Sequence, residues 1–257
     1  MKLHPSEIAI TLFNVCQYCK TESDLDCTLD KLCKTGYQQV QVSGIALPTE
    51  IVANQLKKHH LKCCATHEGM TQLGAEDITQ TVEKLQMLDC DFTALGYPPE
   101  EYHNQDGMRR LAEIFNIQAE KFAKHGIRLG YHNHDFEFEH FSESTTILET
   151  FYGNTNRNVC AELDVHWVTR GGGNPETWIR KLKNRIPVIH FKDFTVYNRQ
   201  PIFCEIGQGN LDWTGILKAC REAEVKTFVV EQDLPFPGRD VFESAKLSFD
   251  FLTSIEW

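Results

Sequence analysis

The segment MRRLAEIFNIQAEKFAKHGIRLGYH, from Met108 to His132, contains one complete helix-to-strand unit of this protein. Apolar residues recur at helical spacing as far as residue 125, and Gly126 is the type of residue that commonly ends a helix. An apolar run with strand character follows at once, over residues 127–132. A long amphipathic helix joined directly to a buried strand is the building unit of α/β proteins with a parallel sheet.

The same alternation extends in both directions along the 257 residues. Apolar runs predict strands at residues 8–13, 61–66, 92–95, 127–132, 159–163, 188–191 and 227–230, and the alternating segment QQVQV predicts an eighth strand at residues 38–42. Helical patterns predict helices at residues 24–34, 48–60, 78–88, 108–125, 145–152, 175–184, 213–224 and 240–253. No linker rich in Pro, Gly or Ser divides the series, so we predict one domain over residues 1–257. Eight strand–helix units predict a closed (β/α)8 TIM barrel.

Composition limits the classes of partner that this chain can bind. The formal net charge of -10 argues against nucleic acid or an anionic membrane as the main partner. No apolar run approaches the roughly 18 residues of a membrane helix, and the first residues lack an apolar signal core. We therefore expect a soluble, cytoplasmic protein, whose ten cysteines are reduced and structural.

Polar and charged residues follow the ends of five predicted strands, where barrel enzymes carry their active sites. In chain order these residues are His67 and Glu68; His132, Asn133, His134 and Glu137; Glu162, Asp164, His166 and Trp167; His190, Lys192 and Asp193; and Glu231 and Asp233. The barrel would bring them to one point. Mixed nitrogen and oxygen ligands suit Mn²⁺, Co²⁺, Fe²⁺ or Zn²⁺, so the sequence predicts a divalent metal site.

Five motifs carry a resemblance to a known family: GYHNHDFEF, ELDVHWVTRGGGNPETWI, IPVIHFKDF, EIGQGNLDW and VVEQD. With these motifs the chain resembles the xylose isomerase-like barrels of the sugar phosphate isomerase/epimerase family. That resemblance implies a divalent metal held by Glu, Asp, His and Glu from the last four strands. Asp164, His190 and Glu231 match the second, third and fourth of these ligands.

The first ligand departs from the family pattern, because the position of the usual fifth-strand Glu falls on His132. Either His132 binds the metal itself, or Glu137 folds back to supply a carboxylate. The position of His132 at the strand end favours His132.

The remaining residues have expected roles around the same site. Glu231 and His134 are candidate catalytic bases, although His134 could instead orient a ligand. Lys192 either neutralises an enolate or pairs with Asp193. The residues expected to contact substrate are His67, Glu137, His166 and Trp167; the alternative for Trp167 is packing in the core.

These residues suggest a metal-dependent isomerase or epimerase that acts on a sugar or keto-sugar through a metal-stabilised enediolate. Loss of a β-hydroxyl from the same intermediate would make the protein a keto-sugar or keto-inositol dehydratase or lyase, and the missing fifth-strand Glu raises this alternative. A third hypothesis is a non-catalytic barrel that binds sugar. Metal-assisted phosphodiester cleavage needs a basic face, which an acidic chain does not favour. The expected partner is a small carbohydrate, and the sequence is also compatible with a homo-oligomer.

Overall fold

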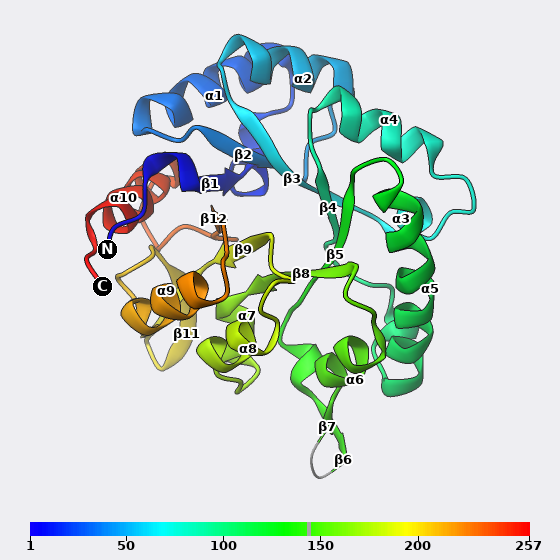
Figure 1. Ribbon diagram of the computed structural model, residues 1–257. Coiled ribbons are helices and arrows are strands. Elements are labelled where there is room, and N and C mark those ends of the chain that lie inside the picture. The colour runs from blue at the N-terminus through cyan, green and yellow to red at the C-terminus, as the bar shows by residue number, and fades with distance from the viewer. Residues whose placement is uncertain (143–144) are drawn as a thin grey trace.

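Eight parallel strands form a closed barrel in the computed structural model, which describes residues 1–142 and 145–257 (Figure 1). The strands are β1 (Ile8–Thr11), β2 (Gln39–Val42), β3 (Lys62–Glu68), β4 (Phe92–Leu95), β5 (Arg128–His132), β8 (Val159–Asp164), β9 (Val188–Phe191) and β12 (Thr227–Val230). They follow one another around the barrel in chain order, and β12 pairs with β1 to close it. The predicted TIM barrel is thereby confirmed.

Helices surround the barrel, as Figure 1 shows. The main ones are α1 (Glu22–Thr35), α2 (Thr49–Lys58), α4 (Thr79–Met87), α5 (Gln105–Ala123), α6 (Ile147–Asn154), α8 (Pro175–Lys181), α9 (Trp213–Glu222) and α10 (Val241–Ser254). Side-chain caps and glycines determine where several of these helices begin and end. Asn104 caps α5 by accepting a hydrogen bond from Gly107 N, and Gly126 adopts a φ of 73° beyond the other end.

Several short elements lie outside the predicted pattern. They are α3 (Met70–Leu73), α7 (Val165–Arg170), the antiparallel pair β10 (Asp193–Tyr197) and β11 (Gln200–Cys204), and the small pair β6 (His140–Ser142) and β7 (Thr145–Thr146). The helix predicted over residues 145–152 begins two residues later, because the Thr146 side chain accepts a hydrogen bond from Glu149 N and caps α6.

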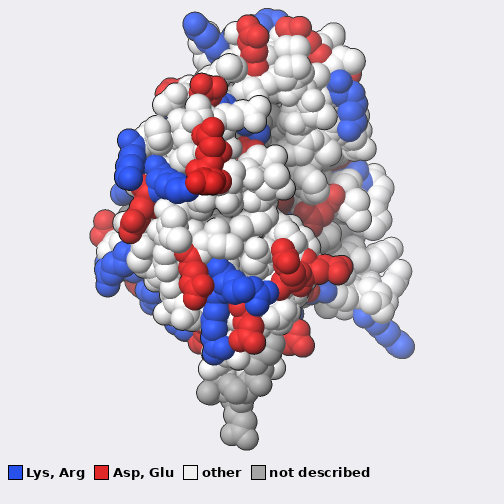
Figure 2. Space-filling model, turned by 90° about the vertical axis from the view of Figure 1, so that its right-hand side faces the viewer, with Lys and Arg blue, Asp and Glu red and all other residues white. Residues whose placement is uncertain are grey.

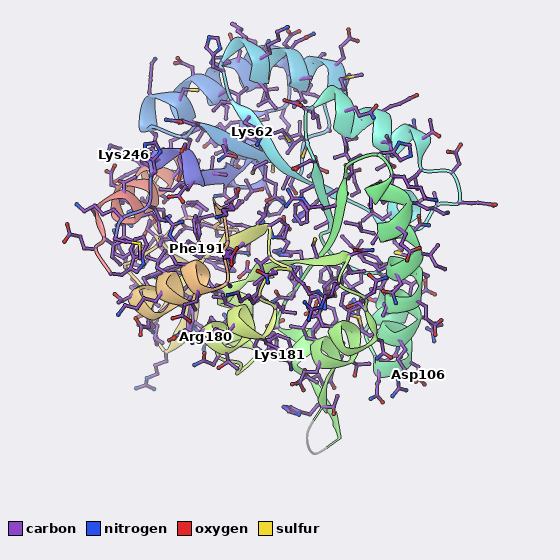
Figure 3. All side chains as sticks on the ribbon, in the orientation of Figure 1. Lys62, Asp106, Arg180, Lys181, Phe191 and Lys246 are labelled. Carbon is purple, nitrogen blue, oxygen red and sulfur yellow. The ribbon has the colours of Figure 1, made fainter. Side chains whose placement is uncertain are left out.

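The apolar core has two parts, one inside the barrel and one between the strands and the helices. The inner part is small and includes Ala9, Phe92, Ala94 and Val229. Phe92 fills so much of the interior that a Cβ at Gly130 would lie 2.6 Å from its ring. Phe191 belongs to the outer part, and Figure 3 places it in the barrel wall, with the labelled charged residues of the helices further out.

The outer surface mixes charges of both signs. Figure 2 shows lysine and arginine side chains interspersed with aspartate and glutamate over the face that it presents. Within the described residues, no helix combines the length and the apolar character that crossing a membrane requires. All ten cysteines are free, in agreement with the prediction that the chain is not a disulfide scaffold.

Candidate active site

Strand alternation decides which side chains enter the barrel. Successive residues of a strand face opposite sides, so residues two apart share a face. On β8, Glu162 and Asp164 both lie in the barrel interior, and on the neighbouring strand His190 follows the same rule. Lys192 continues the inward face just beyond β9. The carboxyl ends of the last four barrel strands therefore deliver charged groups to one point.

Four of these residues form a compact cluster. His132, Asp164, His190 and Glu231 each offer one ligand atom, and these atoms lie within 4.8 Å of one another. All four residues are buried. This is the set that the strand ends and the family resemblance indicated, with His132 in the first position.

Asp164 has one oxygen engaged and one free. Its Oδ1 accepts hydrogen bonds from the backbone N–H groups of His166 (2.8 Å) and Trp167 (3.0 Å), which fixes the start of α7. Its Oδ2 has no hydrogen-bond partner among the described residues. Burial raises the pKa of the Asp164 carboxyl to about 6, although the charge of Lys192 opposes the rise. Among the described residues this oxygen makes no hydrogen bond, and its nearest cation is the Lys192 ammonium at 3.6 Å.

The Lys192 ammonium lies among three carboxylates and is 1% exposed. Its Nζ is 3.6 Å from Asp164 Oδ2, 3.2 Å from Glu231 Oε2 and 3.1 Å from Asp233 Oδ1. Burial disfavours the charged form, but the carboxylates outweigh burial and raise the pKa of Lys192. Lys192 therefore carries its charge throughout the neutral range.

Asp193 is not the partner of Lys192. Its Oδ2 instead accepts hydrogen bonds from Trp213 Nε1 (2.7 Å) and from the backbone of Gly207 (3.0 Å) and Gly209 (3.2 Å). This neighbour of Lys192 therefore holds the loop before α9. The expected pairing of Lys192 with Asp193 is absent from the described structure. The Lys192 ammonium instead faces the site.

His190 is the central member of the cluster. Its Nδ1 is 2.7 Å from Glu231 Oε2, and its Nε2 is 2.7 Å from Gln41 Oε1. Burial acts to lower the pKa of His190, but the negative charges of Glu162 and Glu231 raise it to about 10. In turn, Lys192 and His190 overcome burial and hold the pKa of Glu231 well below its usual value. Without a metal, a proton on His190 balances the excess of carboxylates.

Glu162 is a buried strand-end residue to which the sequence analysis assigned no role. It lies one inward position before Asp164, is 0% exposed, and hydrogen-bonds His67 Nε2. His132 Nδ1 is 3.4 Å from its Oε2, and His190 Nε2 is 3.5 Å from its Oε1. One carboxylate thus contacts three imidazoles and fixes their positions. The signal was present in Glu162-Leu163-Asp164, where residues two apart on a strand must share a face.

His134 and Glu137 belong to the turn that follows β5. Glu137 accepts hydrogen bonds from Tyr131 Oη (2.6 Å) and from His134 N (2.8 Å), so both of its oxygens serve to hold this turn. Burial raises the pKa of Glu137 to about 8 and lowers the pKa of His134 to about 2. His134 is therefore a neutral imidazole, and its ring packs against Tyr97 at 4.9 Å.

His166 and Trp167 lie behind the cluster. The His166 ring packs against Phe194 and Phe203, and burial lowers the pKa of His166 to about 2. The Trp167 ring is 5.4 Å from the ring of His134, and Lys192 Nζ lies 5.0 Å from its centroid. These rings form an aromatic backing for Lys192.

A cavity of about 510 Å³ opens above the cluster. Its lining residues, among those described, are Phe13, Ser43, His67, Gly96, Tyr97, His132, His134, Lys192, Glu231, Asp233 and Leu234. Of the residues expected to contact substrate, His67 lines the cavity, whereas Glu137, His166 and Trp167 lie outside this set. Ser43 and Asp233 also line the cavity, and the sequence analysis had assigned no role to either residue.

The cluster fits a divalent transition metal. It offers two imidazoles and two carboxylates, a mixed set that such ions accept. Burial lowers the pKa of His132 to about 4, which keeps the imidazole neutral with one nitrogen free to bind a metal, and Asp164 Oδ2 accepts no hydrogen bond from the described residues. Buried polar atoms without partners are rare in proteins and indicate a missing ligand. The residues present are therefore suited to hold the ion.

Comparison with known proteins gives the family. The model of the family described as xylose isomerase-like TIM barrel matches residues 22–248. This chain belongs to that family. Comparison with curated protein sequences finds no match.

Solved structures of similar fold show the same barrel architecture. A sugar phosphate isomerase/epimerase from Parabacteroides distasonis has a TM-score of 0.80 at 22% identity, over 98% of this chain and 95% of that one. An L-ribulose 3-epimerase has a TM-score of 0.72 at 17% identity, over 96% of this chain and 93% of that one. The probable 3-DHS dehydratase AsbF from Bacillus anthracis has a TM-score of 0.71 at 16% identity, over 100% of both chains. At these identities the likeness shows the fold alone.

Proposed function

We propose that this protein is a metal-dependent enzyme that enolises a sugar or keto-sugar and then isomerises or epimerises it. The observation that carries the proposal is the cluster of His132, Asp164, His190 and Glu231, two of whose members, His132 and Glu231, line a cavity of about 510 Å³. Sugar epimerases and a dehydratase among the solved structures of the same fold are consistent with this class of substrate.

Each group in the cluster has a chemical role in enolisation. A divalent ion held there would supply a Lewis acid that lowers the pKa of the carbon-bound proton beside a carbonyl. Glu231 lines the cavity and its lowered pKa keeps it ionised, so its carboxylate can accept that proton. The Lys192 ammonium, also on the cavity wall, would stabilise the negative charge that develops on the substrate oxygen.

Dehydration or lyase chemistry is the second candidate, and the distribution of charge supports it. The carboxylates that line the cavity, Glu231 and Asp233, both follow β12, whereas the β5 side presents the neutral imidazoles of His132 and His134. A symmetric epimerase would place a carboxylate on each face of the substrate. After Glu231 removes the carbon-bound proton, the enolate can instead lose a β-hydroxyl as water, if protonated Glu231 returns that proton to the departing oxygen while His134 contacts it.

A deuterium-exchange experiment tests the enzymatic proposal against a non-catalytic sugar-binding barrel. Metal-loaded protein is incubated in D₂O with a panel of ketoses, keto-inositols and 3-keto-sugars, and NMR follows deuterium at carbon. We expect exchange with at least one keto-sugar, and loss of exchange in Glu231→Gln. The matched control is Glu222→Gln, because Glu222 pairs with Arg180 on the exterior. Absence of exchange across the panel, or full exchange in Glu231→Gln, would refute the assigned role.

A further inference from the structure

Three large apolar side chains line the mouth of the cavity and remain open to solvent. Phe13 is 43% exposed, Tyr97 57% and Leu234 66%. We call these three residues the apolar rim. Each follows the carboxyl end of a barrel strand, namely β1, β4 and β12. Because β12 and β1 are neighbours and β4 lies on another side of the barrel, the rim flanks the mouth from two sides.

Packing contacts hold two of the rim side chains, Tyr97 and Phe13, in place. The Tyr97 ring packs edge-on against His134 (4.9 Å), His103 (5.3 Å) and Phe136 (5.8 Å). Phe13 packs so closely on the backbone of Gly44 that a Cβ there would lie 2.9 Å from its ring. Fixed apolar surface beside a polar pocket is typical of a binding site, because exposure of such surface to water is unfavourable.

Charge on the cavity wall disfavours a phosphate group. Among the described residues that line the cavity, Lys192 is the only lysine or arginine. Its ammonium already contacts Asp164, Glu231 and Asp233. A metal ion bound by the cluster would neutralise the negative charge at the bottom of the cavity, but it would place no cation at the apolar rim. The part of a ligand that reaches the mouth therefore meets apolar surface and no phosphate partner.

We propose that the substrate is an unphosphorylated sugar that carries an apolar, flat substituent, as in an aryl glycoside. This inference rests on the proposed function, since it places the sugar on the polar floor. The substituent then lies on Phe13, Tyr97 and Leu234, where it buries the exposed surface of the rim. The occupant is the substituent of the substrate itself, because the rim is continuous with the cavity that holds the sugar.

Equilibrium binding measures this preference without turnover. The probes are the α- and β-anomers of phenyl and methyl D-glucopyranoside, D-glucose 6-phosphate, and phenol alone, each titrated calorimetrically into the metal-loaded protein. We expect a phenyl glycoside to bind at least about tenfold more tightly than the matching methyl glycoside, which corresponds to burial of part of one ring. The sugar phosphate and phenol should both bind more weakly than the phenyl glycoside.

Rim variants locate the effect. Leu234→Ser and Phe13→Ser should each reduce the affinity advantage of the phenyl glycoside over the matching methyl glycoside to about threefold or less. Ile117→Ser is the matched control, because Ile117 is 60% exposed on α5 and is not a lining residue. Circular dichroism checks that each variant is folded.

Four outcomes would overturn the inference: equal affinity for phenyl and methyl glycosides, tightest binding of the sugar phosphate, equal binding of phenol and phenyl glycoside, or no binding of any glycoside. If the apolar rim instead docks another protein, phenyl and methyl glycosides should bind with equal affinity. A rim-dependent phenyl preference without deuterium exchange on any keto-sugar would retain the inference and refute the enzymatic proposal. Deuterium exchange without a phenyl preference would support the enzymatic proposal and refute the inference about the apolar rim.

Discussion

Replacement of Lys192 by methionine should strongly destabilise the metal-free protein. The ammonium is 1% exposed and lies 3.1 to 3.6 Å from carboxylate oxygens of Asp164, Glu231 and Asp233. Removal of one partner from a buried ion pair typically costs about 3–5 kcal/mol, because the remaining charge is left uncompensated. Methionine retains the apolar stem that packs beside Trp167, so the loss reports the charge.

Lys181→Met is the matched control. Lys181 also pairs with a carboxylate, Glu149 at 2.8 Å, and also lies over an aromatic ring, that of Trp178, but its side chain is 47% exposed. Figure 3 places it on the periphery of the molecule. Exposed pairs contribute about 0–1 kcal/mol, so this variant should unfold almost like the parent protein.

The assay is equilibrium unfolding in urea with a chelator present, at pH 8 and at pH 5. At pH 8 we expect Lys192→Met to lose about 3–5 kcal/mol of unfolding free energy. At pH 5 the loss should be smaller, because Asp164, with a pKa raised to about 6, binds a proton and removes one uncompensated charge. A loss at pH 8 no greater than that of Lys181→Met would refute the claim that Lys192 balances the buried carboxylates.

Three further predictions concern the residues around the cluster. Burial raises the pKa of Glu137 to about 8, so the native state holds a proton that the unfolded chain releases near pH 4.5, and stability should fall as pH rises between these values. Glu137→Gln should abolish this fall in pH-dependent urea unfolding; an unchanged pH profile would contradict the shift. Glu162→Gln should weaken metal binding about 10- to 100-fold by calorimetry, because its carboxylate orients three imidazoles; unaltered affinity would count against that role. Gly209→Ala should lower the melting temperature, because a Cβ there would overlap Asp193 Oδ1, and an unchanged melting temperature would show that the loop can shift.

The barrel was predictable because its signals are local and repeated. Most of the eight strands contain a short apolar run, and β2 alternates between glutamine and valine. Each large helix has an amphipathic pattern, so chain order alone gives the topology of a closed parallel barrel. The pair β10 and β11 was missed because it is half-exposed and lies in a stretch that, in the predicted pattern, only connects β9 to α9.

The candidate site was predictable only in part. Strand ends and the family resemblance indicated Asp164, His190 and Glu231, but neither states which groups pair with one another. Glu162 was identified at a strand end but received no role, because a carboxylate inside a barrel needs partners, and its partners His67 and His132 come from other strands. Such contacts depend on tertiary structure, which no local pattern contains.

A titration of Co²⁺ into chelator-treated protein, followed by visible absorption and calorimetry, tests the central claim most directly. We expect saturation at about one ion per chain with the spectrum of mixed nitrogen and oxygen coordination, from a cluster whose ligand atoms lie within 4.8 Å of one another. Asp164→Asn should weaken this binding severely, and His132→Ala should weaken it while Glu137→Gln leaves it intact. Absence of saturable binding in the parent protein, or loss of the ion in Glu137→Gln with full retention in His132→Ala, would contradict the assignment of the metal site.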